Sequence, residues 1–170
     1  MKRRACLALA AAAPLLAGKP PREPMIRFRA KSLDGETFTR ESLKGKVVLI
    51  QYWATWCGYC RKEEPAVEQI IQDHAKDGLV VLAVNAGEPK AKVIDYLKEH
   101  PRTAKIILVS DTDIARIFGG TGVPAYLLID RESNVAAAQP GAGGIMGLRE
   151  MLKEVDLSKQ HFLLRDKPGH

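Results

Sequence analysis

Apolar runs alternate with amphipathic segments along most of the chain. Continuous apolar stretches rich in β-branched residues are typical of strands buried on both faces of a sheet. Such stretches occur in KGKVVLIQYW, LVVLAVN, KIILVSD and AYLLID. Helical periodicity falls between and after them, over residues 57–76, 89–100, 112–118 and 145–155. Because strands and helices alternate, the pattern predicts an α/β domain with a largely parallel sheet flanked by helices.

Antiparallel pairing is expected near both ends of the domain. In MIRFRAKSLDGETF, Ile26 and Phe28 alternate with arginines and Asp34-Gly35 supplies a tight turn, which predicts an N-terminal β-hairpin. The segment NVAAAQ follows the last apolar strand across the turn residues RESN and is expected to pair with that strand. The predicted central sheet is therefore mixed.

The N-terminus has the parts of an export signal. A basic start at Lys2 to Arg4 precedes an apolar run over 5–17, and the run ends on the small residues Ala17 and Gly18. We expect an exported protein that is periplasmic or otherwise extracytoplasmic; an uncleaved signal would instead tether it to a membrane. The predicted organisation is a signal (1–18), a linker (19–24), one domain (25–157) and an irregular C-terminal tail (158–170).

Size and charge narrow the class of protein. The chain of 170 residues suffices for one domain with a good core. Removing residues 1–18 takes away three of the 26 Lys and Arg residues and leaves 23 against 20 acidic residues, a net charge of +3. That excess is too small to indicate a phosphate-binding surface, so we expect no nucleic-acid partner. We expect a monomer.

Two cysteines remain once the signal is removed. Cys6 lies in the signal, and the other two, Cys57 and Cys60, stand in YWATWCGYCRKEEP. A structural zinc site needs about four ligands, which this pair alone does not supply. The four histidines show no metal-binding spacing relative to the pair: His74, His100, His161 and His170. We expect neither a metal nor another cofactor.

The cysteine pair is placed for redox chemistry. A loop that leaves the carboxyl end of a central strand and enters a helix is the usual place for a site in an α/β sheet, and Cys57 stands there. The backbone N–H groups and dipole of the helix start stabilise a thiolate at Cys57, and Arg61 and Lys62 can add to this. Cys60, one turn on, can close a Cys57–Cys60 disulfide. We expect Cys57 to attack and Cys60 to resolve the mixed disulfide.

A glutamate follows the pair on the same helical face. At about 100° per residue, Glu63 projects within roughly 30° of the centre of the apolar face that includes Cys60, against about 70° for Glu64. Burial beside an apolar core favours the neutral form of a carboxyl, so Glu63 is a candidate proton donor or acceptor for Cys60. Pro65 is expected to kink the helix.

Several motifs together resemble the thioredoxin superfamily. WCGYC, EEP, AVNAGEP, SDTDIARIFGGTGVPAYLLID and the final helix resemble its exported TlpA/ResA/CcmG-like thiol:disulfide oxidoreductases over about 25–155. The resemblance implies a thioredoxin-like fold in which 89–118 is a helix-containing insertion. It also implies that Cys57 is the exposed nucleophile and that a cis proline faces the dithiol. We assign substrate binding to the residues around the pair and to that loop: Trp56, Gly58, Tyr59, Val123 and Pro124.

Two positions depart from thioredoxin itself. Gln51 stands where thioredoxin has a buried aspartate, so that proton-handling role is absent or has moved to Glu63. Gly58-Tyr59 replaces the Gly-Pro dipeptide between the cysteines, so thioredoxin's strongly reducing character does not follow. We expect an enzyme that exchanges disulfides with protein substrates as a reductant and draws on a membrane-bound electron donor. Apocytochrome c before haem attachment is one candidate substrate.

Other readings of the motifs stay open. A disulfide-forming oxidant of the same fold would carry nearly the same residues. A metal-handling module, or a binding protein with a purely structural cysteine pair, would belong to another class. A peroxidase of the related peroxiredoxin type needs threonine or serine three residues before its reactive cysteine, and Ala54 occupies that place.

Overall fold

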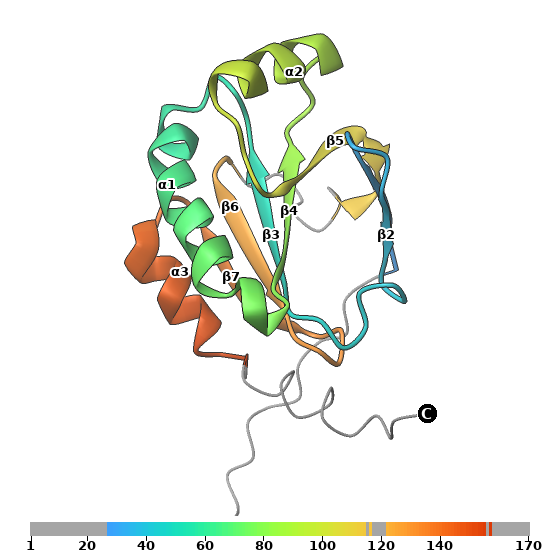
Figure 1. The fold of residues 1–170 in the computed structure, drawn as a ribbon, viewed down its shortest axis with the longest axis vertical. Coiled ribbons are helices and arrows are strands. Elements are labelled where there is room, and N and C mark those ends of the chain that lie inside the picture. Colours follow the sequence, from blue (N-terminus) through green and yellow to red (C-terminus); the bar gives the residue numbers. More distant parts are fainter. Residues whose placement is uncertain (1–26, 115, 117–121, 156, 158–170) are drawn as a thin grey trace, which may run out of the picture.

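The computed structural model describes residues 27–114, 116, 122–155 and 157. Within them, a seven-stranded sheet has the order β2-β1-β5-β4-β3-β6-β7, and Figure 1 shows helices packed beside it. The strands are β1 (Arg29–Ser32), β2 (Thr37–Thr39), β3 (Val48–Trp53), β4 (Val80–Asn85), β5 (Lys105–Thr112), β6 (Ala125–Ile129) and β7 (Val135–Pro140). The helices are α1 (Gly58–Asp73), the short 3₁₀ helix η1 (Ala75–Asp77), α2 (Lys90–Glu99) and α3 (Gly144–Leu152).

The sheet is mixed, as predicted, but it is parallel only at its centre. Strands β3, β4 and β5 pair in parallel, because helices α1 and α2 provide the long crossovers that parallel neighbours need. The other pairings in the described part of the chain are antiparallel, including β1–β2, β1–β5, β3–β6 and β6–β7. The expectation of a largely parallel sheet was therefore wrong. Both predicted hairpins are confirmed, with Gly35 at a φ of 91° in the first turn.

Two apolar layers lie on the two faces of the sheet. Along β3, Val48 and Ile50 contribute to one layer, while Leu49 and Trp53 contribute to the other. The layer with Leu49 also contains Cys60 and residues of α1 and α3. Both faces of β3 are therefore buried, which explains the nearly continuous apolar sequence of this strand.

The helix boundaries differ from the predictions in several places, and α3 ends at Leu152, three residues before the expected end at 155. Helix α1 ends at Asp73 and contains Pro65, and the last residues of the expected helix 57–76 form η1 instead. The expectation of a helix over 112–118 was wrong for Thr112, because this residue is the last residue of strand β5. Residues 115 and 117–118 of that expectation lie outside the described residues, as do the predicted signal, the linker and the tail 158–170.

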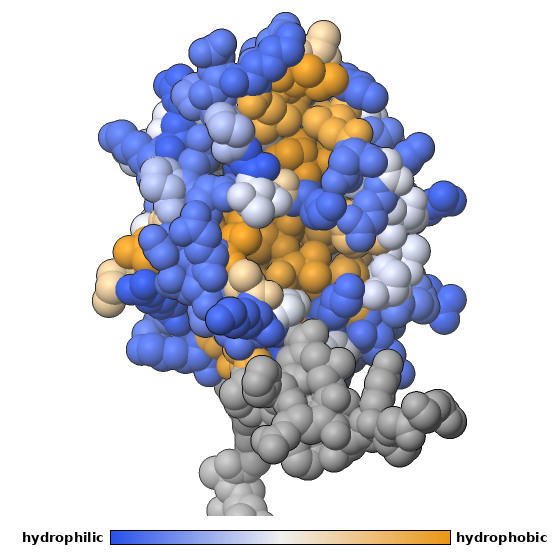
Figure 2. All heavy atoms as spheres, viewed as in Figure 1, coloured by the Kyte–Doolittle hydropathy of each residue, from blue (hydrophilic) through white to orange (hydrophobic). Residues whose placement is uncertain are grey.

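A hollow of about 240 Å³ lies away from the cysteine pair. It is lined by residues of α1, β4 and β5 that include Ile71, Val81 and Lys105, and Figure 2 shows apolar surface between α1 and the β1–β2 hairpin. These positions lie near the amino ends of β4 and β5, whereas Cys57 follows the carboxyl end of β3. The hollow therefore belongs to the opposite end of the sheet. None of the helices among the described residues has the length and hydropathy of a membrane-spanning segment.

Candidate active site

Cys57 and Cys60 form a disulfide at the start of α1. Strand β3 ends at Trp53, and Cys57 is the N-cap residue of the helix, with extended backbone at φ −80° and ψ 105°. The Cys57 Sγ accepts a hydrogen bond of 3.1 Å from the backbone N–H of Cys60. A sulfur at this position occupies the place that capping oxygens take in other helices, so the helix start stabilises negative charge on it.

The two cysteine residues differ in exposure, although less than expected. Cys57 is 5% exposed and Cys60 1%, so the expectation of an exposed Cys57 was wrong in degree. The reason is that the Cys57 sulfur lies between the first turn of α1 and the carbonyl oxygen of Val123, 3.5 Å away. Its neighbours project outward instead: Trp56 is 64% exposed and Tyr59 67%, and Gly58 is also exposed.

The loop before β6 faces the disulfide. The Val123–Pro124 peptide bond is cis, and Pro124 is buried where the strand begins. The contact between Val123 and Cys57 joins residues 66 positions apart in the sequence. In reduced Cys57, the same carbonyl oxygen can accept the S–H. The structure thus brings four of the predicted substrate and catalytic positions together around one sulfur: Cys57, Cys60, Val123 and Pro124.

Glu63 is buried and Glu64 is not, as the helical angles predicted. Glu63 is 4% exposed. Its Oε2 accepts the hydroxyl of Tyr126 at 3.1 Å and the N–H of Gly143 at 3.3 Å, and its Oε1 accepts the N–H of Gly144 at 2.8 Å. These donors come from β6 and from the start of α3, where backbone N–H groups are free to bind an anion. Sequence reasoning missed the two glycines, although a glycine pair directly before a helical pattern signals accessible backbone at a helix start.

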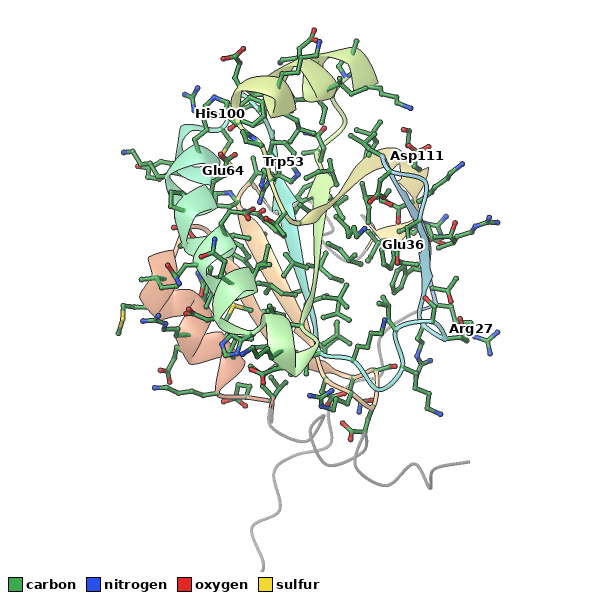
Figure 3. All side chains as sticks on the ribbon, viewed as in Figure 1. Arg27, Glu36, Trp53, Glu64, His100 and Asp111 are labelled. Carbon is green, nitrogen blue, oxygen red and sulfur yellow. A yellow bond between two sulfur atoms is a disulfide. The ribbon has the colours of Figure 1, made fainter. Side chains whose placement is uncertain are left out.

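Glu64 takes part in a separate cluster between α1 and α2. It accepts the hydroxyl of Tyr96 at 2.6 Å, and burial together with this bond raises the pKa of Tyr96. The Tyr96 ring lies 5.6 Å from that of Trp53 and 4.4 Å from that of His100. Figure 3 shows Glu64, Trp53 and His100 gathered where α1, β3 and α2 meet.

Gln51 retains a buried polar contact at the position where thioredoxin has an aspartate. Its side chain is fully buried, and its Nε2 donates to the Tyr126 hydroxyl at 3.1 Å. The two residues are direct cross-strand partners in the β3–β6 pair. Burial, with the charge of Glu63 adding to it, raises the pKa of Tyr126. A lone tyrosine in an otherwise apolar strand was the signal, because a buried hydroxyl needs a partner.

A second carboxylate, which sequence reasoning also missed, anchors the loop before Cys57. Glu88 accepts hydrogen bonds from Thr55, Asn85 and Lys92, and its side chain is only 6% exposed. Burial opposes its charge, but these donors prevail and hold the pKa of Glu88 at about 2. Among the described residues, no group of His, Cys, Asp and Glu side chains could hold a metal ion.

A strand that delivers a Cys-x-x-Cys disulfide to a helix start, opposite a cis proline, defines a thiol-disulfide oxidoreductase with a thioredoxin-like fold. Residues 21–138 match the AhpC/TSA family, and the chain belongs to that family.

Relatives and solved structures support the same class. The chain is 25% identical over 132 residues to the thiol-disulfide oxidoreductase ResA of Halalkalibacterium halodurans, covering 78% of this chain and 72% of that protein. It is 31% identical over 132 residues to the thioredoxin-like protein YneN of Bacillus subtilis, covering 76% of this chain and 75% of that protein. A thioredoxin-family thiol:disulfide interchange protein from Chlorobium tepidum TLS superposes with a TM-score of 0.69 at 26% identity, covering 80% of this chain and 97% of that chain.

Proposed function

We propose that this chain is an exported enzyme that reduces disulfides in protein substrates through Cys57 and Cys60. The observation that carries the proposal is the 3.1 Å hydrogen bond from the Cys60 N–H to the Cys57 Sγ at the N-terminus of α1. This geometry stabilises the thiolate, which is the form of cysteine that attacks a disulfide.

Reduction proceeds through a mixed disulfide. The Cys57 thiolate attacks one sulfur of the substrate disulfide, forms a Cys57–substrate bond and releases the other substrate sulfur as a thiolate. Cys60 loses its proton and attacks Cys57, which closes the Cys57–Cys60 bond and releases the second substrate thiolate. Two electrons pass to the substrate. A dithiol donor must then reduce the enzyme disulfide, and a membrane-bound donor fits an exported domain.

Glu63 acts in this proposal as the proton acceptor for Cys60. Both side chains are buried on one face of α1, three residues apart, which places them on neighbouring turns. Cys60 is 1% exposed, so bulk water does not readily take its proton. Hydrogen bonds from Tyr126 and Gly144 fix the position of the carboxylate.

Substrate contact is assigned to the residues around Cys57. An extended protein segment would pair with the backbone of Val123 next to Pro124, while Trp56 and Tyr59 offer exposed aromatic surface. The residues that carry the proposal are catalytic Cys57, Cys60 and Glu63 and substrate-binding Trp56, Gly58, Tyr59, Val123 and Pro124. Apocytochrome c thiols are one candidate substrate of this kind.

The direction of electron flow is tested by a redox titration of the domain. A midpoint below about −220 mV supports a reductant, and a midpoint near −120 mV supports a disulfide-forming oxidant. Turnover is measured as reduction of insulin disulfides with a dithiol donor. Cys57→Ser should abolish it, and full turnover by Cys60→Ser would show that Cys60 does not resolve the mixed disulfide. Absence of turnover in the wild-type domain would instead support a binding protein with a structural cysteine pair.

Export rests on the sequence of residues 1–18 and is tested independently. Expression of the full chain, followed by fractionation and N-terminal sequencing, should give an extracytoplasmic product that begins after Gly18. A product that keeps its N-terminus and stays with the membrane fraction would support a tether instead.

A further inference from the structure

A chain of side-chain hydrogen bonds leads to Glu63 across the sheet. The guanidinium of Arg102, in the segment between α2 and β5, donates from Nη2 to Gln51 Oε1. Gln51 Nε2 donates to the Tyr126 hydroxyl at 3.1 Å, and that hydroxyl donates to Glu63 Oε2 at 3.1 Å. These hydrogen bonds therefore link a cation between α2 and β5, through β3 and β6, to the carboxylate of Glu63, three residues after Cys60 on α1.

Every link in this chain donates toward Glu63. Arginine has only donors, so Gln51 must turn its oxygen to Arg102 and its amide NH₂ to Tyr126. The Tyr126 oxygen then accepts from Gln51, and its own proton points to Glu63. The last hydrogen bond of the series therefore requires an acceptor at Glu63, and an ionised carboxylate is the strongest acceptor available. Hydrogen bonds arranged in one direction also polarise one another, so the charge of Arg102 strengthens the last bond.

The cost of burying Arg102 is not recovered by other hydrogen bonds. Its guanidinium lies 4.9 Å above the Trp53 ring, and its Nε and Nη1 atoms are buried without a hydrogen-bond partner among the described residues. Burial lowers the pKa of Arg102, while the charges of Glu64 and Glu68 oppose this. Buried donors left unpaired are uncommon and costly. Stability alone therefore does not account for an arginine at this position.

Charged and titratable groups surround this series of hydrogen bonds on the elements packed against it. They are the cysteine pair at the start of α1, Arg61, Glu64 and Glu68 of α1, Tyr96 of α2 with His100 directly after that helix, and Tyr126 of β6. At the start of α3, the N–H groups of Gly143 and Gly144 face Glu63 with the positive end of the helix dipole. Arg102 is the cation that the hydrogen-bond chain connects to this carboxylate.

We propose that Arg102 is a positioning residue for the resolving step, and that it holds Glu63, through Gln51 and Tyr126, as the carboxylate that accepts the Cys60 proton. The inference rests on the proposed function, in which Cys60 attacks the mixed disulfide on Cys57. The proton moves from Cys60 Sγ to Glu63, the Cys57–Cys60 bond forms, and the Cys57–substrate bond breaks. The electron pair of the broken bond leaves on the substrate sulfur.

The two thiol steps can be separated with a nitrobenzoate disulfide reagent. Reduced protein and one equivalent of reagent release one coloured thiolate when Cys57 attacks and a second when Cys60 resolves. Arg102→Met keeps the packing on Trp53 without the charge, and Tyr126→Phe removes only the hydroxyl. Arg149→Met is the matched control, because Arg149 pairs with Asp73 on the surface. All variants are first checked for a native unfolding transition.

We expect Arg102→Met and Tyr126→Phe to slow the second release about three- to tenfold at neutral pH, because residues of one hydrogen-bond network are energetically coupled. The pH at which the second release reaches half of its maximal rate should also rise in both variants. The direction follows because both changes weaken or remove the hydrogen bond that the Glu63 carboxylate accepts from Tyr126. The first release should stay within about twofold, and Arg149→Met should match wild type in both steps. Arg102→Lys, which keeps the charge, should return the pH dependence toward wild type.

The outcomes distinguish this inference from the proposed function. If wild-type protein releases only one equivalent, Cys60 does not resolve and the proposed function fails. If wild type releases both and Arg102→Met is folded but unchanged, only the positioning role is wrong. The same slowing by Arg102→Met in a Glu63→Gln background would also overturn the positioning role, because Arg102 is proposed to act on the second release only through Glu63. Loss of the Arg102→Met effect in that background supports it.

Discussion

Thr55 donates two hydrogen bonds to the carboxylate of Glu88. Its backbone N–H lies 2.7 Å from Oε2, and its hydroxyl lies 2.5 Å from Oε1. Thr55 stands two residues before Cys57, while Glu88 follows β4, so this pair ties the loop that carries the nucleophile to the neighbouring strand. Loops with functional residues are commonly fixed by such contacts from a rigid element.

Glu88→Gln should destabilise the domain by roughly 1–3 kcal/mol at neutral pH, because a neutral amide cannot accept from all of its donors. The loss should depend on pH. The folded-state pKa of Glu88 is about 2 against an ordinary 4.5, so its contribution is present above about 4.5 and disappears as the pH falls toward 2. Urea unfolding of both proteins across this range measures the difference.

The control for this prediction is Glu99→Gln, since Glu99 is an exposed acid at the end of α2. It should change stability by less than about 0.5 kcal/mol at every pH. A difference between Glu88→Gln and wild type that persists unchanged at the acid end would contradict the assignment of the loss to the Glu88 charge.

The reduced Cys57 thiol should lose its proton at lower pH than a free cysteine, for which the value is about 8.5. The helix N–H that the Cys57 sulfur accepts stabilises the thiolate and not the thiol. The rate of alkylation by iodoacetamide, measured against pH in Cys60→Ser, gives the midpoint. A peptide with the same sequence around Cys57 is the reference, and equal midpoints for peptide and protein would refute the helix-start argument.

The parts of this structure that were predictable depend on local pattern. The apolar run of β3 and the helical spacing after Cys57 placed the dithiol at a helix start, and the same spacing identified Glu63 as the buried acid. The partners of Glu63 were not predictable in this way. Gly144 lies 81 residues away, and a glycine reveals nothing of what its N–H will meet. Contacts made by backbone groups across the fold leave no mark in periodicity.

The sheet shows the same division between local and distant information. Each strand was identified from its own residues, but the direction of pairing depends on which strands become neighbours. Strand β5 pairs in parallel with β4 on one side and antiparallel with β1 on the other. Nothing in the β5 sequence distinguishes these two edges. Glu88 was missed for a related reason, because its role depends on Thr55, 33 residues earlier.

Glu63→Gln and Glu64→Gln form a matched pair on adjacent residues. In Glu63→Gln the new NH₂ must face a donor, either Tyr126 or the start of α3, so we expect a loss of roughly 1–3 kcal/mol. In Glu64→Gln the amide oxygen can still accept the Tyr96 hydroxyl, so the loss should stay below about 0.5 kcal/mol. Thermal and urea unfolding of the oxidised proteins measure the loss of stability in each variant. Equal losses in the two variants would show that the burial of Glu63 has no energetic consequence.

Trp56→Ala and Tyr59→Ala should impair the reaction with protein substrates while leaving the fold intact. Both side chains are about two-thirds exposed beside Cys57, so their removal should change stability by less than about 0.5 kcal/mol. Exposed aromatic residues at a contact surface contribute strongly to binding, and we expect kcat/KM for insulin reduction to fall about tenfold. The nitrobenzoate reagent is too small to use this surface, so its reaction with Cys57 should stay within about twofold of wild type. If the reactions with insulin and with the nitrobenzoate reagent slow equally, the aromatic side chains act on the Cys57 thiol itself and not on substrate binding.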